Sequence, residues 1–362
     1  MKKIKVSKFS HGGGIYQVAE KYGISPEEII DFSANVNPWG TSLGLEKIIK
    51  ENLQSIFRYP DTYCRKLTLL LSNHLGIACD NILVGNGATE IIYLAMRAVK
   101  PRYAVIPVPT FSEYERALKL AGGQVKFLYL KERQGFSLNV DALIEKAKKV
   151  QMIILCNPNN PTGNLLPGEE MDKIINNAEK KGIATLLDES FIDFQPEFTL
   201  VDKLKKNKNL IILRSFTKFF SIAGLRLGYA VADKSLISKI KSFKEPWTVN
   251  CLAEVAGIHI LKNLKRAEGL REKTKRERSV LYENLCRIKG IKPYPSQANF
   301  ILIKIKASIS SSYLTEELAK GGILVRDCSN FSGLGDKFIR VAVRKKEENR
   351  KLICSLNQIL TG

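Results

Sequence analysis

Short apolar runs, separated by helical or polar segments, dominate the middle of the chain. Seven runs predict strands, and they begin or fill the segments 81–99, 103–114, 124–130, 152–166, 183–194, 210–213 and 228–233. Runs this short and continuous are typical of strands that are buried on both faces of a parallel sheet. Helical patterns lie between several of them. The pattern therefore predicts an α/β fold with a seven-stranded, mostly parallel sheet between helices.

The pattern changes on both sides of this region. Residues 11–30 predict a glycine turn, a short helix and a second turn, and 45–56 and 64–76 predict helices. Long helical patterns cover 235–288, and a final amphipathic helix covers 345–360. Between these two helical regions, strand patterns recur at 293–306, 313–331 and 337–344.

Charge increases after about residue 260, where we expect a smaller α+β domain. The sequence then divides into three parts: an N-terminal arm, residues 1–40, that contributes to the small domain; a large domain, residues 41–262; and a small C-terminal α+β domain, residues 263–362. A chain of 362 residues is long enough for this division.

Composition excludes several classes of protein. No apolar run approaches about 20 residues, the length needed to span a membrane, and the charged N-terminus lacks the apolar core of a secretory signal. The seven cysteines form no CxxC pair, and the three histidines are scattered. We therefore expect a cytoplasmic protein without membrane segments, a disulfide framework or a metal site.

The net charge of +21 is the one unusual property of the composition. The lysines are dispersed, and the densest basic run, residues 271–278, alternates in sign and predicts a solvated helix face. No nucleic-acid-binding motif accompanies the charge, so we expect no nucleic-acid partner. Anionic small substrates explain the charge equally well.

Residues 210–229 carry the strongest chemical pattern. An apolar strand, 210–213, is followed by Ser215, Thr217, Lys218 and, eight residues later, Arg226. Ligands of open α/β sheets bind at this carboxyl edge. Two hydroxyls and a guanidinium suit a phosphate, and a lysine can form a Schiff base with an aldehyde. The pattern indicates a pocket for pyridoxal 5′-phosphate (PLP), although Lys218 alone could be one of many surface lysines.

The turn after the first strand offers a second phosphate site. Gly85, Gly87, Ala88 and Thr89 are small and stand at a predicted helix start, where N–H groups and the helix dipole attract anions. A plain strand-to-helix turn, capped by Asn86 or Thr89, explains the same residues.

Three further strand ends carry residues that suit a flat, charged ring. Phe111 could stack on such a ring, although aromatic residues in the core are more frequent. Asn160, in the loop NPNNPTG, could bind a phenolate oxygen or merely form a turn. Asp188 could face a pyridine nitrogen and keep it protonated, or cap the next turn. Asp188 precedes Lys218 by thirty residues, the size of one αβ unit.

In this order, NPNNPTG, the Asp188 strand and the Ser215-to-Arg226 pattern resemble the class I and II aminotransferases, a fold type I PLP-dependent superfamily. Within it, the chain resembles the histidinol-phosphate aminotransferases and, more closely, the threonine-phosphate decarboxylases of cobalamin biosynthesis. The closer resemblance rests on HGGGIYQVAEKYGISPEEIIDFSANVNPWG, PTFSEY, LLDESFIDF and RDCSNFSGLG. It implies a fold type I enzyme that decarboxylates L-threonine O-3-phosphate, with histidinol-phosphate transamination or L-serine O-phosphate decarboxylation as alternatives.

The resemblance also implies roles for individual residues. Lys218 and Asp188 would be catalytic, with Lys218 bound to PLP and Asp188 paired with its ring nitrogen. The cofactor would further contact Gly87, Ala88, Thr89, Phe111, Asn160, Ser215, Thr217, Arg226 and Tyr59, the last from the partner subunit of a homodimer. The phosphorylated amino-acid substrate would contact His11, Gly12, Asn35, Asn160, Asn299, Arg326 and Arg340.

One residue departs from the superfamily pattern. Many of its aminotransferases carry a tyrosine three residues after the aspartate, and this chain has Phe191. The missing hydroxyl favours the decarboxylase branch without excluding transamination. A basic protein that binds ligands without catalysis is the remaining alternative.

Overall fold

A computed structural model describes residues 11–40 and 44–361 of the chain. Its largest sheet has seven strands in the order β2-β8-β7-β6-β5-β3-β4. All neighbours run parallel except β8, which is antiparallel to both β2 and β7. The strands are β2 (Ile82–Gly85), β3 (Tyr103–Val108), β4 (Gln124–Tyr129), β5 (Met152–Cys156), β6 (Ala184–Asp188), β7 (Leu210–Ser215) and β8 (Gly228–Ala232). The predicted α/β fold with a mostly parallel sheet is confirmed.

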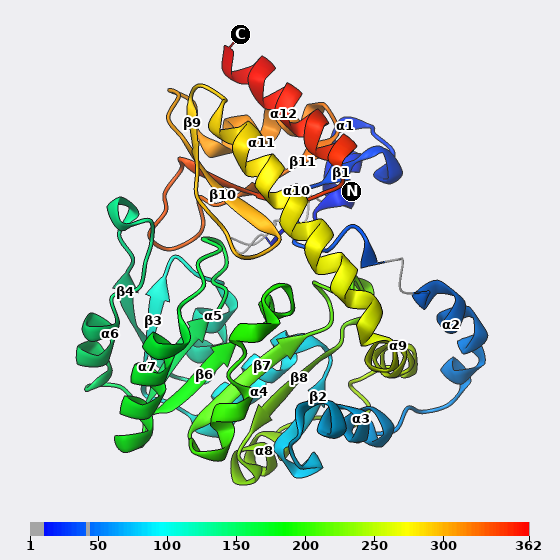
Figure 1. Ribbon diagram of the computed structural model, residues 1–362, viewed down its shortest axis with the longest axis vertical. Coiled ribbons are helices and arrows are strands. Elements are labelled where there is room, and N and C mark those ends of the chain that lie inside the picture. The colour runs from blue at the N-terminus through cyan, green and yellow to red at the C-terminus, as the bar shows by residue number, and fades with distance from the viewer. Residues whose placement is uncertain (1–10, 41–43, 362) are drawn as a thin grey trace.

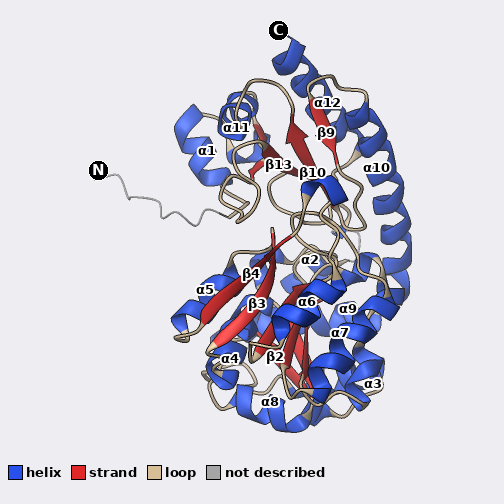
Figure 2. Cartoon of the chain, turned by 90° about the vertical axis from the view of Figure 1, so that its left-hand side faces the viewer, coloured by secondary structure: helices blue, strands red, loops and turns tan. Residues whose placement is uncertain are grey.

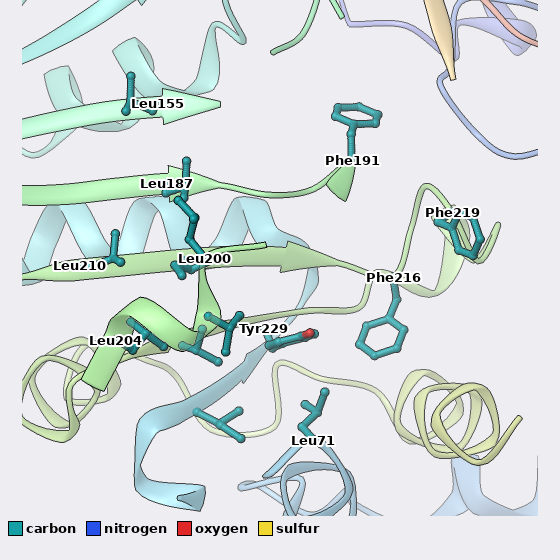
Figure 3. Packing of buried hydrophobic residues seen from close by; sticks show 14 of the residues in the cluster. Leu71, Leu155, Leu187, Phe191, Leu200, Leu204, Leu210, Phe216, Phe219 and Tyr229 are labelled. Atoms are coloured by element: carbon teal, nitrogen blue, oxygen red, sulfur yellow. The ribbon is translucent and has the colours of Figure 1, made fainter. Parts of the chain in front are cut away.

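Helices cover both faces of this sheet, which explains why its inner strands are apolar on both sides. One face packs against α2 (Leu45–Glu51), α3 (Arg65–Leu75), α6 (Val140–Ala147), α7 (Gly168–Lys180) and α9 (Cys251–Lys262). The other packs against α4 (Gly87–Val99), α5 (Glu113–Leu120) and α8 (Lys234–Lys241). Figure 3 shows the first of these cores, in which Leu155, Leu187 and Leu210 come from neighbouring strands.

The segment between β6 and β7 has the length of an αβ unit but no helix of that kind. It contains no α-helix but three short 3-10 turns, Ile192–Phe194, Pro196–Phe198 and Val201–Lys205. Pro196 stands in the middle of the segment and would interrupt any helix formed there. Leu200, Val201 and Leu204 nevertheless pack into the core beside the sheet.

A buried ion cluster ties these turns to the sheet. The Arg214 guanidinium, on β7, donates to Asp193 (2.7 Å) and to Glu189 (3.3 Å). Glu189 also accepts hydrogen bonds from the Thr199 hydroxyl (2.7 Å) and the Leu200 N–H (2.9 Å). Each charge in the cluster therefore has a partner of opposite sign. Such pairing is needed because a buried charge without a partner is strongly destabilising.

A smaller part of the chain stands on the carboxyl-end side of the large sheet. It contains the four-stranded antiparallel sheet β12-β13-β10-β9 and the two-stranded parallel sheet β1-β11. Its strands are β1 (Ile30–Asp31), β9 (Ile291–Pro293), β10 (Phe300–Ile305), β11 (Ile323–Leu324), β12 (Arg326–Asp327) and β13 (Phe338–Ala342). Its helices are α1 (Ile15–Tyr22), α11 (Ser311–Lys320) and α12 (Lys346–Thr361). In Figure 1, α1 and β1 lie beside the C-terminal elements.

The long helix α10 (Glu268–Cys286) runs along one side of both parts (Figure 2). Its basic run, 271–278, is only partly the solvated face that we predicted. Thr274 and Arg278 are buried in line with Leu270, Leu281 and Leu285, because these positions share one helix face. The Arg278 guanidinium donates to the Ala298 carbonyl (3.1 Å). The division of the chain at residues 40 and 262 stays a prediction.

Across residues 11–40 and 44–361, no helix has both the length and the apolar character needed to cross a membrane. The seven cysteines are free thiols. Within the same described ranges, no cluster of histidine, cysteine and carboxylate side chains could hold a metal ion.

Candidate active site

A cavity of about 450 Å³ lies where the carboxyl ends of β5, β6 and β7 face the smaller part of the chain. It brings together predicted residues from distant segments: His11, Gly12, Asn35, Ala88, Thr89, Phe111, Asn160, Asp188, Ser215, Thr217, Lys218, Arg226, Arg326 and Arg340. A larger open groove of about 930 Å³, between α3 and α8, contains none of the predicted residues. The chemistry is therefore concentrated in the smaller cavity.

Lys218 presents its amine to this cavity just beyond β7. Burial, followed by the charges of Arg340 and Arg226, lowers the pKa of Lys218 from 10.5 to about 8, while Asp188 acts in the opposite direction. The main chain of the lysine is held as well, because its carbonyl accepts from the Asn37 N–H (3.0 Å). The structure thus provides a lysine with an anchored main chain and an amine that is partly neutral near neutral pH.

Asp188 ends β6 at the floor of the cavity and is almost completely buried. Its carboxylate accepts hydrogen bonds from the Tyr114 hydroxyl (2.6 Å) and the Ser190 N–H (2.8 Å). Burial raises the pKa of Asp188 above its usual 3.8, and these hydrogen bonds with the Lys218 charge limit the rise. The sequence analysis missed Tyr114, although it quoted the string PTFSEY that contains it.

The start of α4 carries the predicted phosphate residues. Asn86 forms no side-chain cap there, so a turn capped by that side chain is not supported; the Asn86 N–H donates to Glu90 Oε2 (2.6 Å). Gly87 has a φ of +76°, and a Cβ at this position would lie 2.6 Å from Nη2 of Arg226. Only glycine therefore lets the guanidinium pack against the helix start.

Two hydroxyls complete this group of donors. Ser215 Oγ and Thr217 Oγ1 lie 2.8 Å apart, and both residues line the cavity with Ala88 and Thr89. Hydroxyls, N–H groups at a helix start and a guanidinium are the donors that bind phosphate. The predicted phosphate residues therefore form one cradle.

Arg340, on β13, reaches the same cavity from the smaller part of the chain. It donates to Asn160 Oδ1 and to the Ser33 carbonyl (2.6 Å from Nη2). Its Nε is buried and has no partner among the described residues. Burial is the main cause that lowers the pKa of Arg340 from 12.5 to about 10. Because Asn160 accepts through its oxygen, its amide N–H groups remain available to an oxygen of a bound ring.

Arg326, on β12, is a second buried guanidinium at the cavity wall. It donates to the Asp327 carbonyl and to Asn330 Oδ1, both at 2.7 Å, and lies over the Phe331 ring at 5.1 Å. These contacts fix its direction, so Arg326 and Arg340 are two positioned cations for an anionic ligand.

The N-terminal segment closes the opposite wall. His11 Nε2 lies 3.0 Å from Glu113 Oε1, and the His11 ring is 5.7 Å from that of Phe111. Asn35 is also buried there, and its Oδ1 has no hydrogen-bond partner within residues 11–40 and 44–361. The sequence analysis missed Glu113, because nothing in the sequence connects it with a histidine 102 positions away.

Three predicted residues do not line the cavity: Tyr59, Asn299 and Gly87, the last of which packs against Arg226. Tyr59 is 82% exposed and packs on Trp247, with ring centroids 4.8 Å apart. Asn299 is completely buried just before β10, and both polar atoms of its side chain lack a partner among the described residues. Its predicted contact with the substrate stays a prediction.

The residues present fit an aromatic aldehyde phosphate. The cradle supplies donors for the phosphate, Lys218 supplies an amine for the aldehyde, and Asp188 supplies a buried carboxylate for a protonated ring nitrogen. Asn160 can donate to a ring oxygen, and Phe111 offers a flat surface beside it. These groups come from the ends of β3, β5, β6 and β7 and from the start of α4, so the fold brings them together.

Comparison with known proteins agrees with this arrangement. The family model "Aminotransferase class I and II" matches residues 27–356. Threonine-phosphate decarboxylase from Salmonella typhimurium is 36% identical over 98% of this chain and 97% of its own length.

Two solved structures are similar over most of the chain. Histidinol-phosphate aminotransferase from Clostridium acetobutylicum aligns with a TM-score of 0.85 and 35% identity, covering 91% of this chain and 98% of that chain. L-threonine-O-3-phosphate decarboxylase from Porphyromonas gingivalis aligns with a TM-score of 0.81 and 30% identity over 91% of this chain and 98% of its own.

Proposed function

Because the chain belongs to the aminotransferase class I and II family, we propose that it decarboxylates L-threonine O-3-phosphate with PLP as cofactor. The product would be (R)-1-amino-2-propanol O-2-phosphate, used in cobalamin biosynthesis. The observation that carries the proposal is the single cavity in which a lysine amine with a pKa of about 8, a buried carboxylate and two positioned arginines meet. The similarity to threonine-phosphate decarboxylases over more than nine-tenths of the chain supports L-threonine O-3-phosphate as the substrate.

Each part of PLP has residues that would hold it. The cradle of Ala88, Thr89, Ser215, Thr217 and Arg226 would bind the phosphate, with Gly87 making room for the guanidinium. Asp188 would bind the ring nitrogen, Asn160 the ring oxygen and Phe111 one face of the ring. When bound, PLP supplies an electron sink for the bond that breaks at the substrate Cα.

Two residues of the chain would carry the chemistry. The carboxylate of Asp188, made more basic by burial, would keep a proton on the ring nitrogen of bound PLP. The neutral fraction of Lys218 makes its Nζ a nucleophile toward an aldehyde and, later, a carrier of protons. In the reaction, the bond between Cα and the carboxylate breaks, CO₂ leaves, and Lys218 Nζ delivers a proton to Cα.

The arginines would decide which bond at Cα breaks. Arg340 has an unpartnered Nε, and Arg326 is held in place beside Phe331. We propose that both bind the substrate phosphate, which leaves the carboxylate as the group that departs. An aminotransferase would instead have to hold the carboxylate and expose the Cα–H bond to the base.

Histidinol-phosphate transamination is the second candidate, and the similarity to an aminotransferase structure at 35% identity favours it. Phe191 argues for the decarboxylase. Its ring lines the cavity and packs edge-on against Phe300 at 5.0 Å, so no hydroxyl reaches the ring oxygen from this position. Turnover with and without 2-oxoglutarate separates the two candidates, because only transamination consumes the keto acid. Decarboxylation of L-serine O-phosphate is tested in the same assay.

A homodimer with shared active sites is part of the proposal. Tyr59 stands outside its own cavity and is exposed beside other apolar side chains, namely Phe57, Ile56 and Leu53. Exposed apolar groups in this number are typical of an interface. We propose that Tyr59 reaches the cofactor phosphate of the partner subunit. Sedimentation of the purified protein tests the dimer, and Tyr59→Ala should weaken PLP binding without separating the subunits.

A further inference from the structure

Glu113 is a carboxylate in a cavity that is otherwise rich in positive charge. Among the described residues lining it, only Asp188 and Glu113 are acidic, whereas Arg116, Lys218, Arg226, Arg326 and Arg340 are basic. Asp188 has a place in the proposed chemistry, and Glu113 has none. A carboxylate facing an anionic substrate repels it unless a cation stands between them.

The surroundings of Glu113 keep it ionised and fixed. Its side chain is 6% exposed at the first residue of α5. One oxygen lies 3.0 Å from His11 Nε2, and the other accepts from the Tyr93 hydroxyl at 2.5 Å. The hydrogen bond with His11 is the largest cause of its lowered pKa, and it outweighs the effect of burial. Arg116 adds a positive charge 3.7 Å away.

This contact determines the direction of the His11 ring. A carboxylate can only accept, so Nε2 is the donor and Nδ1 is the nitrogen left for a ligand. In the part of the chain that the structure describes, Nδ1 makes no hydrogen bond. The ring also stands beside Phe111, which places it next to the proposed cofactor.

The arm that carries His11 is anchored a second time. The Gly13 N–H donates to Ser33 Oγ (2.7 Å), and a Cβ at Gly12 would lie 2.2 Å from the Ser33 carbonyl oxygen. That same carbonyl accepts from Arg340. Residues 11–13 are therefore held between Glu113 and the segment that also holds a substrate arginine.

We infer that Glu113 is a positioning residue that acts through His11: it accepts from Nε2–H and holds the ring so that Nδ1 faces an anionic group of the substrate, which the doubly protonated ring binds through Nδ1–H. The inference rests on the proposed function for the identity of the substrate. The contact between His11 and an anionic group does not depend on the proposed function, because a phosphate and a carboxylate can each bind a positively charged imidazole. Glu113 itself touches neither the substrate nor the reacting atoms.

A double-mutant cycle on the PLP-loaded protein tests this inference. Glu113→Gln keeps the shape and removes the charge, and His11→Ala removes the group through which Glu113 acts. We expect each variant to raise KM for L-threonine O-3-phosphate about tenfold, with kcat within about threefold of the wild type. The two changes together should raise KM no more than either alone, because they break one interaction.

Equilibrium binding makes the test independent of turnover. Calorimetric titration with L-threonine O-3-phosphate, L-threonine and inorganic phosphate should show the same loss in both variants for at least one ligand. If the variants lose affinity for inorganic phosphate, His11 binds the phosphate of the substrate. If they lose affinity for L-threonine, His11 binds the carboxylate of the substrate. If the wild type binds the phosphorylated amino acid but does not turn it over, the proposed reaction fails while the cycle still tests Glu113.

Glu115→Gln is the matched control, because Glu115 lies on the same helix and pairs with Lys119 at the surface; its KM and affinities should equal those of the wild type. If Glu113→Gln does not fold, Glu113→Asp keeps the charge but withdraws it from His11, and the same rise in KM is expected. Additive effects of the Glu113 and His11 variants, or unchanged affinity for all three ligands, would overturn the inference.

Discussion

Lys218 should react with an aldehyde at a pH at which ordinary lysines scarcely react. Burial, with the charges of Arg340 and Arg226, lowers its pKa from 10.5 to about 8. This difference corresponds to about 3 kcal/mol in favour of the neutral amine. Near pH 7.5, roughly one quarter of the Lys218 amines are neutral, against roughly one in a thousand for a lysine of ordinary pKa.

The assay is the rate at which the PLP-free protein forms a covalent adduct with pyridoxal, which lacks the phosphate and so does not use the cradle. Borohydride fixes the adduct, and peptide mass spectrometry assigns it to Lys218 rather than to other lysines. The rate should rise with pH and level off with a midpoint at about 8, because only the neutral amine attacks. Lys218→Ala should give no adduct in this peptide.

Two variants test the causes of the lowered pKa of Lys218. Arg340→Met removes a positive charge and should move the midpoint of Lys218 to higher pH. Asp188→Asn removes the opposing negative charge and should move it to lower pH. A midpoint near 10 in the wild type, or shifts in the reverse directions, would refute the reasoning about this pocket.

Three other predictions concern the cradle, the ion cluster and the electron sink. Gly87→Ala should raise the Kd for PLP about tenfold, because a Cβ there meets a guanidinium at 2.6 Å, whereas Gly122→Ala, at a similar positive φ in open space, should leave it unchanged; fluorescence titration measures both, and equal Kd values would contradict the cradle. Arg214→Met should lower the free energy of unfolding in urea by about 3–5 kcal/mol, since it leaves the buried Glu189 unpaired, and a loss below about 1 kcal/mol would count against the cluster. Asp188→Ala should lower kcat roughly 100-fold while the lysine adduct still forms, and full activity would exclude its role at the ring nitrogen.

The fold could be predicted from the sequence because its central strands are short, apolar and closed by distinctive strand ends. Lys218, Asp188 and Asn160 each follow such a strand, so parallel neighbours bring them to one edge. The thirty residues from Asp188 to Lys218 have the length of one αβ unit, but a spacing does not reveal what fills it. Here a buried ion cluster around Arg214 ties down three short turns instead.

The contacts around the predicted residues could not be read from the chain. Tyr114 reaches Asp188 across 74 positions, and Arg340 reaches Asn160 across 180. These pairs depend on how α5 packs against the large sheet and on how the smaller sheet is placed above it, which periodicity does not determine. Glu113 was missed for the same reason, and an acidic residue at a helix start is more often a simple capping charge.

Product analysis distinguishes decarboxylation from transamination. The purified protein is given PLP and L-threonine O-3-phosphate labelled with ¹³C in the carboxylate, without a keto acid. We predict labelled CO₂ and an equal amount of 1-amino-2-propanol O-2-phosphate. No labelled CO₂, together with glutamate formed from histidinol phosphate and 2-oxoglutarate, would contradict this prediction and identify the protein as an aminotransferase.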